Sequence, residues 1–232
     1  DQIYLPKVRP PGFSIGDTVE ITPTTKKKVN FYTHQVATLE PLKSIIKDEI
    51  FSYFEHTENT FITGSFLEEG FQFNDIDVLV LAAPGHEKSW SDHFKWKLGL
   101  SFHIICIDRK SLQQGLQQDP LFQMMMSKYI ARKRELFRYK NVFNYKLLDL
   151  HLHKSRTILD SFEILTGKEK YNLVRNMVAI SLFLKGKKLG AETVEKEMEK
   201  IFGEGIPQKL RENIIHKEPF LKKYKKTYDK TF

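Results

Sequence analysis

The chain has 232 residues, 41% of them hydrophobic, and a formal net charge of +8. This length allows one large domain or two small ones with a packed core, so we expect a folded, soluble protein. No stretch approaches the roughly 18 to 20 consecutive apolar residues of a membrane span, which predicts no membrane partner. A cytoplasmic location follows by default, although a chain that begins with Asp1 rather than Met says less about targeting. The single cysteine, Cys106, excludes an internal disulfide and is expected to be a buried small hydrophobe.

Nearly all of the excess positive charge lies in two segments. Residues 128–140 contain six basic residues against Glu135, and residues 217–232 contain six lysines against two acidic residues. Basic segments attract phosphates, and the aromatic residues interleaved with them are of the kind that stacks on nucleic-acid bases. The alternative is two solvated basic helices whose aromatic residues face the core. The candidate nucleic-acid contacts are Lys128, Arg132, Lys133, Arg134, Arg138, Lys222, Lys223, Lys225 and Lys226.

Helices and strands alternate along the first half of the chain. Residues 1–33 are rich in Pro and Gly and predict an extended arm with a short strand at 18–21. An amphipathic helix is predicted from Val36 to His56, followed by strands at 60–63 and 76–82 with a turn or short helix at 66–73 between them. A helix around 90–98, a strand at 100–107 and a helix from residue 110 follow.

Beyond Pro120 the pattern is helical. Helices are predicted at 121–138, 142–166, 168–186, 191–202 and 207–227, with Gly and Pro at the breaks. The predicted fold is an α/β (α+β) core with a small mixed sheet, followed by an all-α C-terminal domain. The predicted boundaries are 1–33 for the arm, 34–120 for the core and 121–232 for the helical domain.

Two acidic residues on the strongest predicted strand carry the chemistry. Asp75 and Asp77 alternate with apolar residues, so both carboxylates project from one face of the strand. Two like charges held this close favour a cation, and carboxylate oxygens are the ligands that Mg²⁺ prefers. Gly64 and Ser65 close the preceding strand and offer a backbone N–H and a hydroxyl to a phosphate. A metal beside a phosphate-binding turn is the arrangement that phosphoryl transfer needs.

Two short motifs resemble the signature of polymerase-beta-like nucleotidyltransferases. They are Thr63-Gly64-Ser65 and, after nine intervening residues, Asp75-Ile76-Asp77-Val78. In that family an hG[GS] turn is followed by Dh[DE]h, and the resemblance covers about residues 36–118. It implies that Gly64 and Ser65 bind a nucleoside triphosphate and that Asp75 and Asp77 hold Mg²⁺ or Mn²⁺. A chance strand with ordinary turn chemistry upstream is the alternative.

The sequence departs from the family pattern at the third carboxylate. The next strand of the family carries an acidic residue that completes the site, and the corresponding position here is His103. Histidine brings no negative charge and suits softer metals than Mg²⁺. Asp108 is the nearest acid, but residues 103 and 108 cannot share a face of a regular strand without a bulge. The other interpretation of Asp108 is a cap for the helix that begins near Lys110.

These features predict a metal-dependent nucleotidyltransferase that transfers a nucleoside monophosphate to a hydroxyl acceptor, with RNA favoured by the basic segments. The alternative is a catalytically impaired protein of this fold that acts as a nucleotide- or nucleic-acid-binding subunit or antitoxin-like regulator, with a protein partner unspecified. A third hypothesis takes Arg211 and His216 as the loose Rx4–6H pattern of HEPN ribonucleases, which requires the two side chains to meet.

Overall fold

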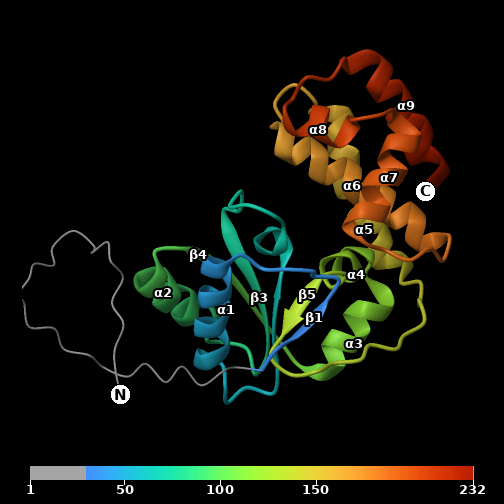
Figure 1. Cartoon of the computed structure of the whole chain (residues 1–232). Coiled ribbons are helices and arrows are strands. Elements are labelled where there is room, and N and C mark those ends of the chain that lie inside the picture. The colour runs from blue at the N-terminus through green and yellow to red at the C-terminus, as the bar shows by residue number, and fades with distance from the viewer. Residues whose placement is uncertain (1–29, 232) are drawn as a thin grey trace, which may run out of the picture.

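The computed structural model describes residues 30–231, so the predicted strand at 18–21 lies outside the described residues. The described chain forms two lobes, a sheet with flanking helices and a bundle of helices (Figure 1). The structure is thus an α+β fold with a small mixed sheet and a mostly helical remainder, as the sequence predicts.

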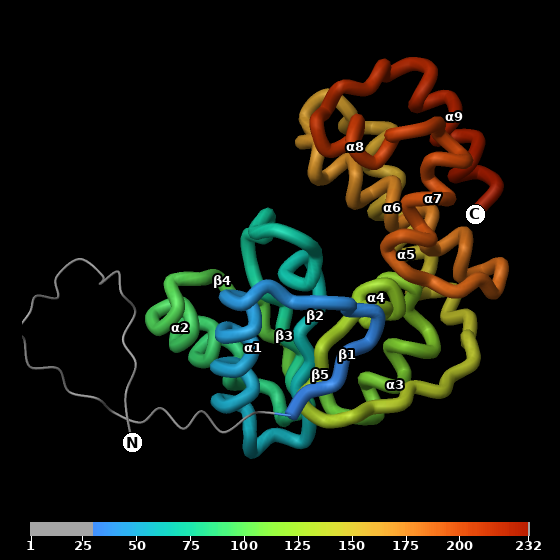
Figure 2. Tube along the Cα trace, viewed as in Figure 1, coloured from blue at the N-terminus to red at the C-terminus, as the bar shows by residue number. Residues whose placement is uncertain are grey.

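The sheet has five strands in the order β1-β5-β2-β3-β4. The strands are β1 (Tyr32–His34), β2 (Thr60–Thr63), β3 (Asp75–Leu81), β4 (Ser101–Ile107) and β5 (Tyr129–Ala131). Only β3 and β4 are parallel, and the helix α2 (Glu87–Leu98) provides the crossover between them. Figure 2 shows that β1 and β5 lie side by side although they are far apart in the sequence, and the pairing of Thr33 with Ile130 agrees.

Both faces of the sheet are covered at β3, because this strand is apolar on both sides. Ile76, Val78 and Val80 pack with α2 and α1 (Pro41–Tyr53). Leu79 and Leu81 face the other way and pack with α3 (Arg109–Gln118). Since side chains alternate along a strand, Asp75 and Asp77 lie on the α3 side, where they follow the buried leucines toward the start of β3.

The helical lobe is built around α6 (Gly167–Leu184), whose residues Val174, Met177 and Val178 are fully buried. Around it pack α4 (Pro120–Met125), α5 (Tyr145–Asp160), α7 (Ala191–Phe202), α8 (Ile206–Arg211) and α9 (Lys217–Thr231). The Thr166 hydroxyl accepts a hydrogen bond from the Glu169 backbone N–H, and the Glu169 carboxylate accepts one from the Thr166 N–H. This capping box fixes where α6 begins. None of the helices within residues 30–231 is long and apolar enough to cross a membrane.

Two of the predicted helices are wrong. The predicted helix at 121–138 ends at Met125, and residues 129–131 instead form β5, whose Ile130 is fully buried between β1 and β2. The sheet therefore continues past the boundary predicted at residue 120. The predicted helix at 207–227 is interrupted after Arg211, because Asn213 adopts a left-handed conformation with φ of 61°.

We predict that Tyr224→Phe lowers the free energy of unfolding by about 1 kcal/mol, the typical net value of a hydrogen bond. Tyr224 is fully buried, and its hydroxyl donates to the backbone oxygen of Ser155 at 2.9 Å, which ties α9 to α5. Urea denaturation measures the change. The control is Tyr145→Phe, since Tyr145 is 66% exposed. Equal unfolding free energies of the two variants would show that the hydrogen bond does not stabilise the lobe.

Candidate functional site

The strand register brings the predicted turn and the predicted aspartates together. In the antiparallel pair β2 and β3, Thr63 lies opposite Asp77. The chain then turns at Gly64 into the short 3-10 helix Gly64–Leu67. On the other side of β3, the parallel register places His103 opposite Asp77. Thr63, Asp77 and His103 therefore form one row across three strands, with the Gly64 turn at its end.

Gly64 is held against Asp77 in a conformation that favours glycine. Its φ is +77°, in the left-handed region, and a Cβ built on it would collide with the Oδ2 atom of Asp77. The backbone of the turn thus approaches the carboxylate more closely than any other residue type allows. Ser65 is exposed, and its hydroxyl makes no hydrogen bond within residues 30–231, so it is available to a ligand.

The surroundings of Asp77 shift its pKa. Burial raises its pKa above the ordinary aspartate value, and repulsion from Asp75 adds to this rise. A hydrogen bond from the imidazole of His103 opposes it, with 3.0 Å between Nδ1 and Oδ1. The charge of Lys168, from the start of α6, also lowers the pKa. The carboxylate is 29% exposed, so a ligand can still reach it.

These donors fit a hard divalent cation that also binds a substrate. Within the described chain no group of three or more His, Cys, Asp or Glu side chains converges as a complete protein metal site. Mg²⁺ is commonly held by only one or two carboxylates, with water and substrate phosphates filling the other positions. Asp75 and Asp77 supply two carboxylates on one face, and their mutual repulsion is what a cation would relieve.

Asp108 does not belong to this site. It follows β4 at the opposite end from Ser101, about 16 Å along the strand from His103 at the usual rise per residue. Its side chain accepts a hydrogen bond from the backbone N–H of Ser111 at 2.7 Å and caps α3, and this bond lowers its pKa. The sequence offered this cap as the alternative role, and the structure contradicts the prediction of Asp108 as the third carboxylate.

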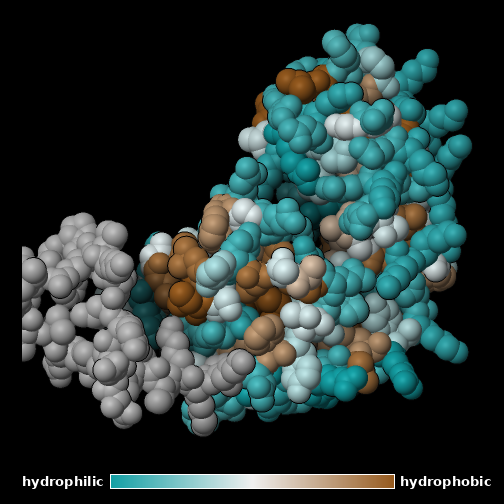
Figure 3. All heavy atoms as spheres, in the orientation of Figure 1, coloured by the Kyte–Doolittle hydropathy of each residue, from teal (hydrophilic) through white to brown (hydrophobic). Residues whose placement is uncertain are grey.

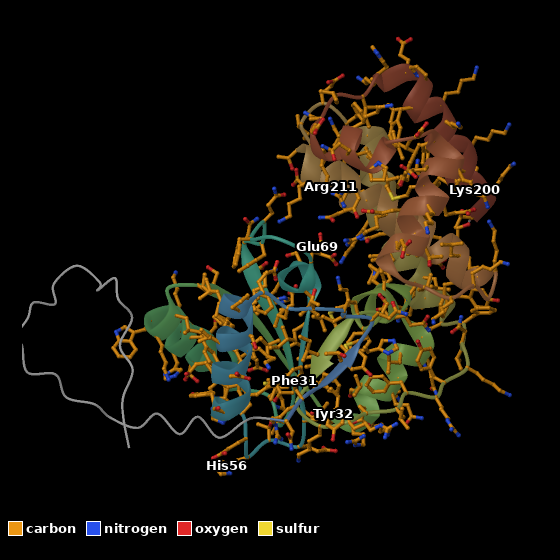
Figure 4. The ribbon with its side chains drawn as sticks, viewed as in Figure 1. Phe31, Tyr32, His56, Glu69, Lys200 and Arg211 are labelled. Carbon is orange, nitrogen blue, oxygen red and sulfur yellow. The ribbon has the colours of Figure 1, made fainter. Side chains whose placement is uncertain are left out.

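The helical lobe faces the site. Figure 3 shows a recess between the two lobes that is bordered mainly by hydrophilic residues. In Figure 4, Glu69 lies at the upper edge of the sheet lobe and Arg211 on the facing side of the helical lobe. Arg211 stacks on Tyr171 with its guanidinium carbon 3.9 Å from the ring centre. Lys168 lies in the same part of the lobe, because the adjacent Gly167 packs on the backbone of Arg211.

The candidate nucleic-acid contacts divide into two groups. Two of them are engaged inside the protein: Lys128 pairs with Glu68 at 3.0 Å, and Arg132 is half-buried and donates to the backbone oxygen of Thr57. The other seven are exposed and form no ion pair within residues 30–231: Lys133, Arg134, Arg138, Lys222, Lys223, Lys225 and Lys226.

The aromatic residues of the basic segments mostly pack inward. Tyr129, Phe220, Tyr224 and Tyr228 are all buried. The alternative in which these rings face the core is therefore the correct one for them, and base stacking on them is excluded by burial.

Cys106, Arg211 and His216 were also singled out in the sequence, and the structure shows what surrounds each of them. Cys106 is partly buried, and burial raises the pKa of its thiol to about 11, so it stays protonated. Arg211 forms an ion pair with Glu195, whereas His216 is exposed, and no hydrogen bond, ion pair or ring contact joins it to Arg211 within the described residues. The HEPN-like hypothesis therefore lacks the meeting of side chains that it requires.

The search against known protein families, curated proteins and solved structures found no match for this chain.

We predict that Gly64→Ala is much more damaging than Gly70→Ala. Both glycines have a left-handed φ, so each alanine costs on the order of 1 kcal/mol in backbone strain. A Cβ at Gly70 meets open space, whereas a Cβ at Gly64 displaces the Asp77 carboxylate. We expect Gly64→Ala, but not Gly70→Ala, to weaken Mn²⁺-dependent nucleotide binding at least tenfold. This loss of affinity corresponds to about 1.4 kcal/mol of binding free energy and can be measured by isothermal titration calorimetry. Equal binding by both variants would contradict the close approach.

Proposed function

We propose that this chain is a metal-dependent nucleotidyltransferase that transfers a nucleoside monophosphate from a nucleoside triphosphate to a hydroxyl acceptor. The observation that carries the proposal is the packing of the Gly64 turn against Asp77, beside Asp75 on the same face of the sheet. A phosphate-binding turn and a pair of carboxylates are then adjacent, which is the requirement of metal-assisted phosphoryl transfer.

Each residue has a distinct task in this proposal. Asp75 and Asp77 hold the divalent cation, and the backbone N–H groups and the Ser65 hydroxyl at the turn bind triphosphate oxygens. When bound, the cation offsets negative charge on the attacking and leaving oxygens. The acceptor oxygen bonds to the α-phosphorus, the bond from that phosphorus to the bridging oxygen breaks, and pyrophosphate leaves. The acceptor proton passes to solvent.

Lys168 supplies positive charge from the other lobe. Its electrostatic interaction with Asp77 places it within reach of the charges that gather at the site. A triphosphate brings several negative charges, so a lysine across the recess favours its binding and orients it between the lobes. The same reasoning favours a polyanionic acceptor such as RNA over a cationic one, because exposed lysines and arginines prevail outside the aspartate pair.

A second candidate function is supported by His103. It occupies the strand position opposite Asp77 where the family pattern has an acid, and its side chain is 61% exposed. A site with one carboxylate fewer binds the cation less tightly. The alternative is therefore a protein of this fold that binds nucleotide or nucleic acid as a regulator or subunit without transferring the nucleotide.

We predict that Asp75→Asn/Asp77→Asn abolishes the transfer of label from α-³²P nucleoside triphosphates to cellular RNA in the presence of Mg²⁺ or Mn²⁺. The amides keep the size of the side chains and remove both negative charges. Asp108→Asn is the control, since Asp108 caps α3 away from the site and keeps transfer within about twofold. Transfer that survives the double substitution would refute the metal site, and triphosphate binding without transfer by the wild type would favour the second candidate.

We also predict that His103→Asp strengthens metal binding. Without metal, a third carboxylate beside Asp77 adds repulsion between negative charges. With metal, it provides an additional ligand for the cation. In EDTA the variant should melt at a lower temperature than the wild type, and Mn²⁺ should raise its Tm more. His103→Asn removes the same hydrogen bond without adding charge and is the matched control. An equal response of both variants to Mn²⁺ would show that a carboxylate at position 103 does not take part in binding the cation. Transfer that appears only in His103→Asp would identify the wild type as impaired.

A further inference from the structure

The last helix separates two grooves of different charge. One groove, of about 690 Å³, is lined by Lys223, Lys226 and Lys230 of α9 together with Lys185 at the end of α6. Its one acidic residue is Glu197, which is already paired with Lys200 at 3.5 Å. The groove on the other side of α9 is mixed: Arg156, Lys222 and Lys225 line it together with Asp160 and Asp229. Only the first groove, here called the lysine groove, presents a strong excess of positive charge.

The four lysines of the lysine groove are free to bind a ligand. All of them are exposed, and none forms an ion pair within residues 30–231. Lys223, Lys226 and Lys230 are three and four residues apart, so they form one stripe along α9. Holding these like charges together is unfavourable until an anion neutralises them. The stripe spans about 10 Å at 1.5 Å per residue, a length over which one strand of a duplex presents about three phosphates.

The shape of this surface favours a strand over a membrane. A helix that lies on a membrane directs an apolar face outward, but Phe220, Tyr224 and Tyr228 of α9 are buried in the lobe. The lysines instead line a concave groove, which fits an extended polyanion. The described lining has no aromatic ring on which a base could stack, so contacts are expected with the backbone and independent of base sequence.

We infer that the lysine groove binds the phosphodiester backbone of a nucleic-acid strand. This binding deepens the proposed function, because it names a nucleic acid as the acceptor. Only the role of the strand as acceptor rests on the proposed function. Binding itself requires neither the aspartates nor a nucleoside triphosphate. It extends the candidate contacts to Lys185 and Lys230, and it assigns Lys222 and Lys225 to the other groove.

The test compares two double substitutions on α9. Lys223→Ala/Lys226→Ala removes two charges from the lysine groove, and Lys222→Ala/Lys225→Ala removes two from the mixed groove. Binding of fluorescein-labelled 20-nucleotide oligo(U) and oligo(dT) is measured by anisotropy over a series of salt concentrations. We expect the first pair to weaken binding on the order of tenfold and to lower the slope of log K against log salt by about 2. We expect the second pair to change affinity less than threefold.

Several outcomes would overturn the inference. Equal losses of affinity for the two double variants would mean that net charge alone attracts the probe. If the wild type bound neither oligonucleotide, nucleic acid would be excluded as the ligand of the groove. Tighter binding to anionic vesicles or to poly-glutamate, with the same dependence on Lys223 and Lys226, would assign the groove to a membrane or an acidic protein. The Asp75→Asn/Asp77→Asn variant separates the two proposals, since it should lose transfer and keep strand binding. Preference for oligo(U) or oligo(dT) identifies the source of the strand.

Discussion

The candidate site depends on the antiparallel register of β2 and β3. This register ends β2 at Thr63 opposite Asp77, so the chain must turn beside the carboxylate, and only glycine fits the turn. A shift of one residue would direct both aspartates to the face covered by α1 and α2. The register is fixed because β3 is buried on both faces, with Val78 on one side and Leu79 on the other. The packing of the core thus determines the geometry of the site.

The aspartate pair is maintained against an electrostatic cost. Burial and the charge of Asp75 both disfavour the ionised form of Asp77, whereas His103 and Lys168 favour it. The two stabilising groups come from different parts of the chain, one from the neighbouring strand and one from the helical lobe. Such unrelieved charge is typical of a site where a bound cation completes the neutralisation. A cation that bound this pair in the folded state alone would stabilise the fold.

Sequence patterns predicted those parts of the fold that depend on neighbouring residues. The shared face of Asp75 and Asp77 follows from strand alternation, and the cap at Asp108 from its place before a helix. β5 was missed because three residues are too few to show alternation, and Tyr129 to Ala131 form a strand only by pairing between β1 and β2. Lys168 was missed because no local pattern distinguishes it from other surface lysines. Its relation to Asp77 exists only when the lobes face each other.

The arrangement of charge over the two lobes constrains the acceptor. In Figure 1, α9 lies on the side of the helical lobe away from the gap between the lobes, whereas Lys168 acts on Asp77 across that gap. A strand in the lysine groove is therefore held on the outer side of the lobe and not directly at the aspartates. If both proposals hold, the acceptor must be long enough to pass around the lobe with its reacting end free. A mononucleotide or dinucleotide gains nothing from the lysine groove, whereas a structured RNA can be held there by its body while its end reaches Asp75 and Asp77.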